Sequence, residues 1–387
     1  MLTRYGVLVF SLTFLSRTSS PAQLQESTTI GGYGNAFYQR DANQKKSTAD
    51  VERFVLFLGH SFNAKTSFVS ELEIEDAKVS GGETGGEVAL EQAYLKFNID
   101  PDHYFTAGLF IPRIGILNEN HLPNTFNGNA RTQVETFILP STWRELGIGF
   151  YGSINSGPFN YSAAIVNGLN SEAFEHGSGI RQGRFEGRNA SANNLAITGA
   201  LQFNIGNIKT QVSGYYGGSV AAEPQQADTL GLASGMFGTP VIVGEADVQF
   251  ESGAFSAKIL GTIVSIPDAA NINRAYANNA PQTEYGAYAE VAYNLFQNIE
   301  EAKPQQLNLF VRYEKLDMNA SIPYNGTIDA TLNQGHLTTG LSYLPLNNVV
   351  LKADVRFVRT GNQNPAISSG PYETSNTFIT LGFGFSF

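Results

Sequence analysis

Along most of the chain, apolar and polar residues alternate with the period of two that a β-strand produces. The final segment shows this most clearly, because one face carries Thr377, Ile379, Leu381, Phe383, Phe385 and Phe387. In the segment before it, Lys352, Asp354 and Arg356 share the face opposite Leu351 and Val355. A strand buried in a soluble sandwich would not carry three charges on its inner face, whereas a strand between lipid and a water-filled lumen would.

About sixteen segments of strand length show this alternation. They lie near residues 29–40, 50–62, 65–79, 87–99, 104–115, 144–155, 159–169, 195–205, 207–220, 240–252, 254–265, 284–296, 306–317, 334–346, 348–360 and 377–387. Short connections, such as Gly206 and Asn347, alternate with long ones, as in a barrel with tight turns at one end and loops at the other. The pattern therefore predicts an all-β fold, a transmembrane antiparallel up-and-down β-barrel wide enough for an aqueous channel.

The first residues have the character of an export signal. Arg4 precedes an apolar run over residues 5–15, and Ser20-Pro21-Ala22 supplies small residues at its end. We expect a signal peptide over residues 1–22, and one barrel domain over residues 23–387 because no linker divides the rest. No run long enough for a membrane-spanning helix follows, so a membrane-embedded chain would have to cross the bilayer as a closed barrel.

The composition narrows the function classes. The 24 Lys and Arg residues face 34 Asp and Glu residues, and the net charge of −10 argues against a nucleic-acid partner, which requires a basic face. Charged residues make up 15% of the chain, fewer than the roughly 25% of a typical soluble domain. The chain has no cysteine, so disulfides and thiolate metal sites are excluded.

A family resemblance rests on a group of residues between positions 104 and 169. They are Gly108, Phe110, Pro112, Gly115, Glu135, Pro140, Arg144-Glu145-Leu146-Gly147, Gly149, Gly152, Tyr161 and Val166-Asn167-Gly168. This region resembles the phosphate-selective porin O and P family of sixteen-stranded porins, which implies a passive, homotrimeric porin. Leu109 stands where that family has a basic residue, and Pro112 lies one position early. Because of these departures, the resemblance by itself does not imply phosphate selectivity.

The end of the chain supplies a second resemblance. Phe383, Phe385 and Phe387 alternate along the last predicted strand. This pattern resembles the C-terminal signal by which outer-membrane proteins are recognised, which implies the barrel assembly machinery as a partner.

In the porin family the third extracellular loop folds inward and narrows the pore, so the resemblance implies the same constriction for residues 116–143. Six arginines lie in or beside this segment and the next long connection, 170–194: Arg113, Arg131, Arg144, Arg181, Arg184 and Arg188. Grouped near one mouth, they would focus anions, because low-dielectric walls concentrate the field of a charged cleft. The alternative is that they form salt bridges that hold the loops closed.

Strand parity predicts a mixed set of charges along the lumen. The basic members are Lys209, Lys258, Arg312, Lys352 and Arg356, and the acidic members are Glu71, Glu73, Glu75, Glu145, Glu245, Asp247, Glu290, Glu314 and Asp354. These charges do not form a continuous row of basic residues along the lumen. Three alternatives therefore remain: a weakly selective pore, a pore that prefers anions, and a pore that prefers cations or sugars.

Two groups of residues bear on metal binding. Glu71, Glu73 and Glu75 could offer oxygens to Ca²⁺, but a wet stripe paired with lysine or arginine is the simpler interpretation. His103, His121 and His176 lie at no spacing that indicates a metal site, and ordinary turn and loop histidines are the simpler interpretation. We therefore expect neither a metal nor a cofactor.

The function expected from the sequence is a porin-like channel for passive diffusion of small hydrophilic solutes and ions across the cell outer membrane. A more specific form of this expectation is a preference for anions, with phosphate as the candidate anion. The alternative is a non-conducting structural or adhesive barrel. No outward Ser/His pair near the lipid edge could be assigned, so we do not expect an enzyme. The expected partners are membrane lipids, lipopolysaccharide and small ions.

Overall fold

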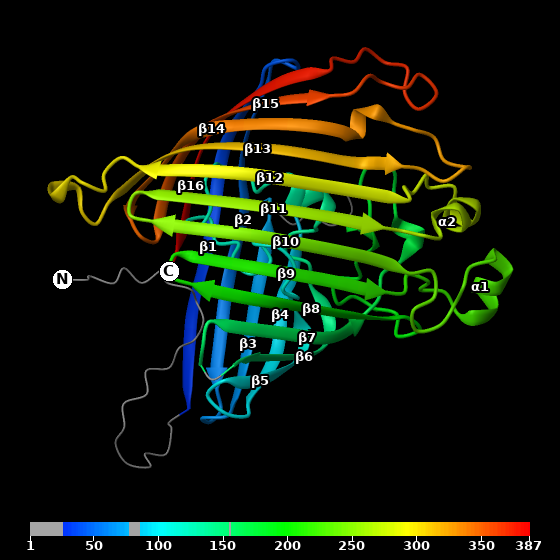
Figure 1. The fold of residues 1–387 in the computed structure, drawn as a ribbon, viewed down its shortest axis with the longest axis horizontal. Helices are drawn as coiled ribbons and strands as arrows, with labels where there is room; N and C mark the ends of the chain where they lie inside the picture. Colours follow the sequence, from blue (N-terminus) through cyan, green and yellow to red (C-terminus); the bar gives the residue numbers. More distant parts are fainter. Residues whose placement is uncertain (1–25, 77–85, 155) are drawn as a thin grey trace.

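The computed structural model describes residues 26–76, 86–154 and 156–387, which form a closed antiparallel barrel of sixteen strands (Figure 1). Each strand pairs with its neighbours in the sequence, and β1 (Ser27–Asp41) closes the barrel on β16 (Ser375–Ser386). The predicted fold class is confirmed. The expected signal peptide, residues 1–22, lies outside the described residues.

The other strands follow the predicted order. They are β2 (Lys46–Ser61), β3 (Thr66–Glu75), β4 (Val88–Asn98), β5 (His103–Phe110), β6 (Glu145–Ser153), β7 (Phe159–Asn167), β8 (Leu195–Ile205), β9 (Ile208–Gly217), β10 (Val241–Ser252), β11 (Phe255–Ser265), β12 (Thr283–Asn294), β13 (Gln306–Ser321), β14 (Asn333–Leu346) and β15 (Val349–Thr360). Two short helices, α1 (Pro224–Leu230) and α2 (Ala269–Tyr276), lie in the connections. Within the described ranges, no helix is long and apolar enough to cross a membrane.

Strand register places the apolar residues on the outside. Leu351 pairs with Phe383 across β15 and β16, and their side chains are 47% and 48% exposed. Lys352, next to Leu351, and Thr380, three residues before Phe383, are buried. The protein covers the inward side chains and leaves the outward apolar ones bare, which suits an outer surface in contact with lipid.

The connections at the two ends of the barrel differ in length. Turns such as 206–207, 253–254 and 347–348 join strands at one end. The connections that contain α1 and α2 lie at the opposite end (Figure 1). The connection 295–305 is the long exception at the short-turn end, as the sequence indicated.

Several predicted strand boundaries were wrong by four residues or more, among them the ends of β5 and β13. The strand expected over 104–115 ends at Phe110, because Pro112 has no N–H to donate to a ladder and Gly115 has a φ of +80°. From residue 111 the chain leaves the wall. The strand expected to end at residue 317 continues as β13 to Ser321, so the connection after it is shorter.

Which face of the strands contacts lipid can be tested by placing a charge on the outer or on the inner face of the β1–β16 pair. Leu381→Arg puts a guanidinium on the lipid side and should lower the free energy of unfolding in liposomes by about 2–4 kcal/mol. Gln39→Arg is the matched control, because Gln39 bonds to inward-facing Thr380 next to Leu381. Equal losses of stability in the two variants, measured by denaturant unfolding, would contradict the assigned facing.

Candidate functional site in the barrel lumen

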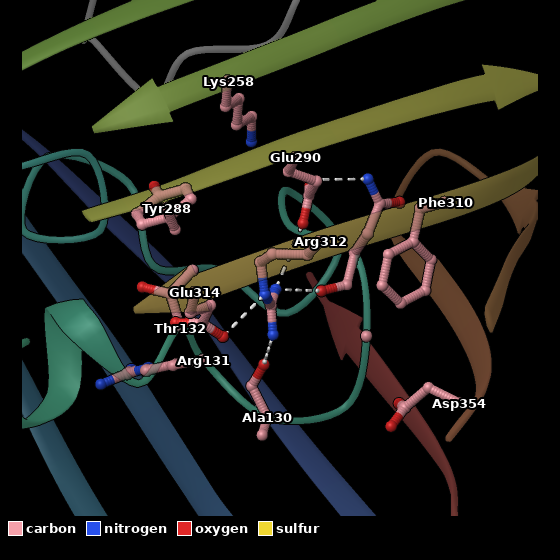
Figure 2. A network of polar contacts seen from close by, with 12 residues as sticks. Ala130, Arg131, Thr132, Lys258, Tyr288, Glu290, Phe310, Arg312, Glu314 and Asp354 are labelled. Atoms are coloured by element: carbon pink, nitrogen blue, oxygen red, sulfur yellow. Dashed lines mark hydrogen bonds and ion pairs between the residues drawn. The ribbon is translucent and has the colours of Figure 1, made fainter. Parts of the chain in front are cut away.

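The connection between β5 and β6, which we call L3 (residues 111–144), lies inside the barrel and is bound to its wall. Arg312 of β13 donates hydrogen bonds to the carbonyl oxygens of Asn127 (3.2 Å) and Ala130 (3.3 Å), as Figure 2 shows. Glu314 of the same strand accepts the backbone N–H groups of Gln133 (2.6 Å) and Val134 (3.2 Å). Charged side chains of the wall thus satisfy loop backbone groups that have no strand partner.

Arg312 is also held by two carboxylates. Its guanidinium lies 3.2 Å from Glu290 and 3.0 Å from Glu314, and its side chain is 2% exposed (Figure 2). A guanidinium so far from water is tolerated only where its donors are satisfied and its charge is compensated. Both conditions are met, so Arg312 anchors L3 to β12 and β13.

A second anchor lies on β15. The Lys352 ammonium donates to the carbonyl oxygen of Gly128 (2.7 Å) and lies 3.8 Å from the centre of the Phe126 ring. Asp354 accepts the backbone N–H (2.7 Å) and the side-chain N–H (2.6 Å) of Asn129. These neighbours on one strand therefore bind consecutive residues of the loop.

Small residues on β16 let L3 approach the backbone. A Cβ atom added to Gly384 would lie 2.4 Å from Pro123 Cβ, and one added to Gly382 would lie 2.2 Å from Asn129 Oδ1. Both distances are shorter than any normal contact, so only glycine fits at these positions.

Glu135 holds L3 to itself and to β12. Its carboxylate accepts the backbone N–H groups of Ile116 and Leu117, both at 2.7 Å, and the Tyr288 hydroxyl at 2.7 Å. Burial raises the pKa of Glu135, while these three donors favour its charged form. The start of the segment predicted to constrict the pore is thereby joined to Glu135, in its second half.

Three of the six predicted arginines lie together around one cavity. Arg144 and Arg184 both bond to Glu186, at 2.9 and 2.7 Å. Arg181 donates to the carbonyl oxygen of Thr136 (2.7 Å), and burial lowers its pKa to about 10, so it remains charged at neutral pH. The cavity has a volume of about 170 Å³ and is also lined by Glu73, Glu75 and Glu87.

The other three arginines lie elsewhere. The Arg113 guanidinium is 5.1 Å from the centre of the Tyr151 ring, on the β6 wall. Arg131 points away from Arg312 toward the blue N-terminal strands in Figure 2. Arg188 is exposed. The sequence-predicted cluster of six is therefore divided among four places.

The remaining predicted residues lie on the inner wall, and two of the basic ones contact L3. Lys209 pairs with Glu119, and Lys258 donates to the Thr125 carbonyl oxygen at 3.3 Å. Arg356 lies over the ring of Phe378, 4.7 Å from its centre. In the acidic triplet, Glu73 bonds to Arg53 at 3.4 Å, Glu71 accepts from Gln92 at 2.8 Å, and Glu75 faces the cavity.

The aromatic residues of the last strand lie at the closing seam. Phe383 and Phe387 are exposed on the outer surface, and Phe385 is half-buried. The Phe387 backbone exchanges two hydrogen bonds with Gly32, at 3.0 and 2.9 Å, so the end of the chain is paired with β1.

Sequence reasoning missed several lumenal residues. Arg53 of β2 bridges Glu52 and Glu73, and Glu91 of β4 accepts the Tyr33 hydroxyl at 3.0 Å. The alternation of side chains along β2 could have shown that Arg53 points into the lumen. Glu91 lies at an irregularity in strand pairing that alternation does not reveal.

Comparison with known proteins gives two kinds of similarity. No family model matches the chain. A protein of Aquifex aeolicus (strain VF5), described only as uncharacterized, is 32% identical over 344 residues, which cover 86% of this chain and 76% of that protein.

Several solved structures that resemble this one are outer-membrane proteins and porins. Salmonella typhi OmpF in complex with daunomycin has a TM-score of 0.58 at 10% identity, over 93% of this chain and 97% of that one. The outer membrane channel DcaP of Acinetobacter baumannii has a TM-score of 0.55 at 13% identity, over 96% and 100%. An anion-selective porin from Comamonas acidovorans has a TM-score of 0.52 at 12% identity, over 94% and 100%. The chain therefore belongs to the same family as the Aquifex aeolicus protein, and its fold is that of the outer-membrane porins.

Proposed function

We propose that the protein is a channel for passive diffusion of small hydrophilic solutes and ions across the outer membrane, narrowed by L3. The observation that carries this proposal is a closed barrel with an apolar outer surface, a charged inner wall and a long loop bound inside it. This combination is typical of a porin, in which lipid contacts one face of each strand and water contacts the other. Contact with lipid and lipopolysaccharide, insertion by the barrel assembly machinery and a homotrimeric state belong to the same proposal.

The channel we propose is narrow. Inward-facing Glu290, Thr338 and Ser342 are at most 5% exposed, because L3 covers much of the wall. The same burial favours the second candidate, a structural barrel that does not conduct. Conductance separates the two candidates, since only an open path carries ions.

The more specific part of the proposal is that the channel prefers anions to cations. Lys96 and Arg113 are half-buried, and neither forms a salt bridge within 4.0 Å with any residue that the structure describes. The Lys96 ammonium lies 4.0 Å from the centre of the Tyr104 ring, and Tyr104 stacks on Tyr151, which Arg113 also contacts. Unpaired cations on a lumenal wall attract anions, and phosphate is the anion that the sequence resemblance suggests testing first.

The constriction can be tested by shortening L3. Deleting residues 122–131 removes the part that crosses to β13, β15 and β16, while the strand ladder is untouched. We expect single-channel conductance in planar bilayers to rise at least about twofold, because loops are separable from the ladder that holds the barrel.

The control is a deletion of residues 366–370, in the exposed connection between β15 and β16. It should leave conductance unchanged. A correctly inserted L3 deletion without altered conductance would show that L3 does not limit the flow. An absence of conductance in both the wild type and the L3 deletion would support the structural barrel.

Ion preference can be tested by reversing charges on the wall. Arg113→Glu and Lys96→Glu should each shift the reversal potential toward cations, more at 0.1 M salt than at 1 M, because screening acts over about 10 Å at the lower concentration. Arg188→Glu, at an exposed loop position, should shift it much less. Reversal potentials that do not change in the first two variants would remove the anion preference and leave a weakly selective pore.

A further inference from the structure

Three segments bring an imidazole and two carboxylates together on the side of the lumen opposite the Arg312 anchor. The residues are Glu71 of β3, Glu91 of β4 and His121 of L3, and one candidate ligand atom from each lies within 4.8 Å of the other two. Glu91 is 0% exposed and His121 is 9% exposed. The cluster therefore lies inside the protein, where charged and polar atoms need partners.

A β-bulge orients Glu91 into this cluster. In the pairing of β3 with β4, Glu71 faces Gln92 and Leu72 faces Leu90, so Glu91 is the additional residue of the bulge. Bulges re-aim side chains and are concentrated near functional sites. Here the bulge places two residues of β4, Glu91 and Gln92, opposite Glu71.

Two of the atoms lack a partner. One oxygen of Glu91 accepts the Tyr33 hydroxyl, but Oε1 is buried and accepts no hydrogen bond from the residues described in the structure. His121 Nδ1 is likewise buried and unpartnered among those residues. Glu91 Oε1 and His121 Nε2 are 3.8 Å apart, too far for a hydrogen bond. Two ligands of a tetrahedral ion, each at about 2.0–2.1 Å from it, lie about 3.3 Å apart, so a small movement would let both bind one ion.

The surrounding charge also favours a cation. Glu52 and Glu73 are joined by Arg53, at 3.3 and 3.4 Å. Arg131 acts electrostatically on Glu91 from the loop. Three guanidinium groups, those of Arg53, Arg131 and Arg144 (3.9 Å from Glu73), thus stand against the four carboxylates of Glu52, Glu71, Glu73 and Glu91. This balance leaves a negative charge that a bound cation would offset.

We propose that Glu71, Glu91 and His121 bind one divalent transition-metal ion of the Zn²⁺ class and thereby join L3 to β3 and β4. Three protein ligands with nitrogen and oxygen donors and one open position are typical of Zn²⁺ sites. Ca²⁺ requires six to eight oxygen ligands, and an imidazole suits transition metals instead. The bound ion holds L3 on the side of the lumen that Arg312 and Lys352 do not reach, whether or not the barrel conducts.

The test is metal binding to the full chain, folded in detergent and freed of metal with a chelator. Titration calorimetry with Zn²⁺ and visible absorption with Co²⁺ should show one saturable site per chain. Glu71→Gln, Glu91→Gln and His121→Gln should each weaken binding at least tenfold, since each removes one ligand. Glu75→Gln, on the same strand, and His336→Gln, at another buried lumenal histidine, should bind as the wild type does.

Several outcomes would overturn the proposal. They are the absence of saturable Zn²⁺ or Co²⁺ binding to the folded wild type, unchanged affinity in the three ligand variants, or Ca²⁺ binding that is tighter than Zn²⁺ binding and survives His121→Gln. If His121→Gln does not fold, as judged by heat-modifiable migration, Glu71→Gln and Glu91→Gln decide the question. A glutamine oxygen can still accept from Gln92 and Tyr33 at those positions.

Discussion

Backbone N–H and C=O groups surrounded by lipid have no water to bond with, so the protein must pair all of them within itself. The sixteen-stranded barrel meets this demand only because β16 bonds to β1, which leaves no open edge. Alternation along the strands follows from the same demand. Once the backbone is paired in a ladder, side chains can only point outward, as Phe383 does, or inward, as Lys352 does.

The same demand explains why the inner wall is charged where L3 lies. A loop inside a barrel has backbone groups that no strand can pair, and here side chains pair them. Arg312 donates to two loop carbonyls, Glu314 accepts two loop amides, and Glu135 accepts two more. Charges that look like pore-lining groups in the sequence therefore also serve as structural anchors, and only those without such a partner, such as Arg113, remain free to act on ions.

Local patterns predicted the barrel, because strand parity and turn spacing depend on neighbouring residues. Leu351 and Phe383 could be placed outside from the sequence alone. The partners of Lys352 and Asp354 could not be predicted, since L3 lies more than two hundred residues away in the chain and its path depends on the whole lumen. The cluster of Glu71, Glu91 and His121 was hidden for two reasons: its members come from separate segments, and a bulge shifts the parity of β4.

The closing seam makes the barrel sensitive to chain length in a way that a layered fold is not. Every other strand pair joins neighbours in sequence, but the seam joins residues such as Tyr38 and Leu381, from opposite ends of the chain. Loop-closure entropy opposes such a contact until the intervening strands have already formed, so we expect the seam to form last. A chain that stops before β16 would leave β1 and β15 as bare edges, able to pair with other chains. Premature termination before β16 would therefore yield aggregation-prone sheets rather than shortened barrels.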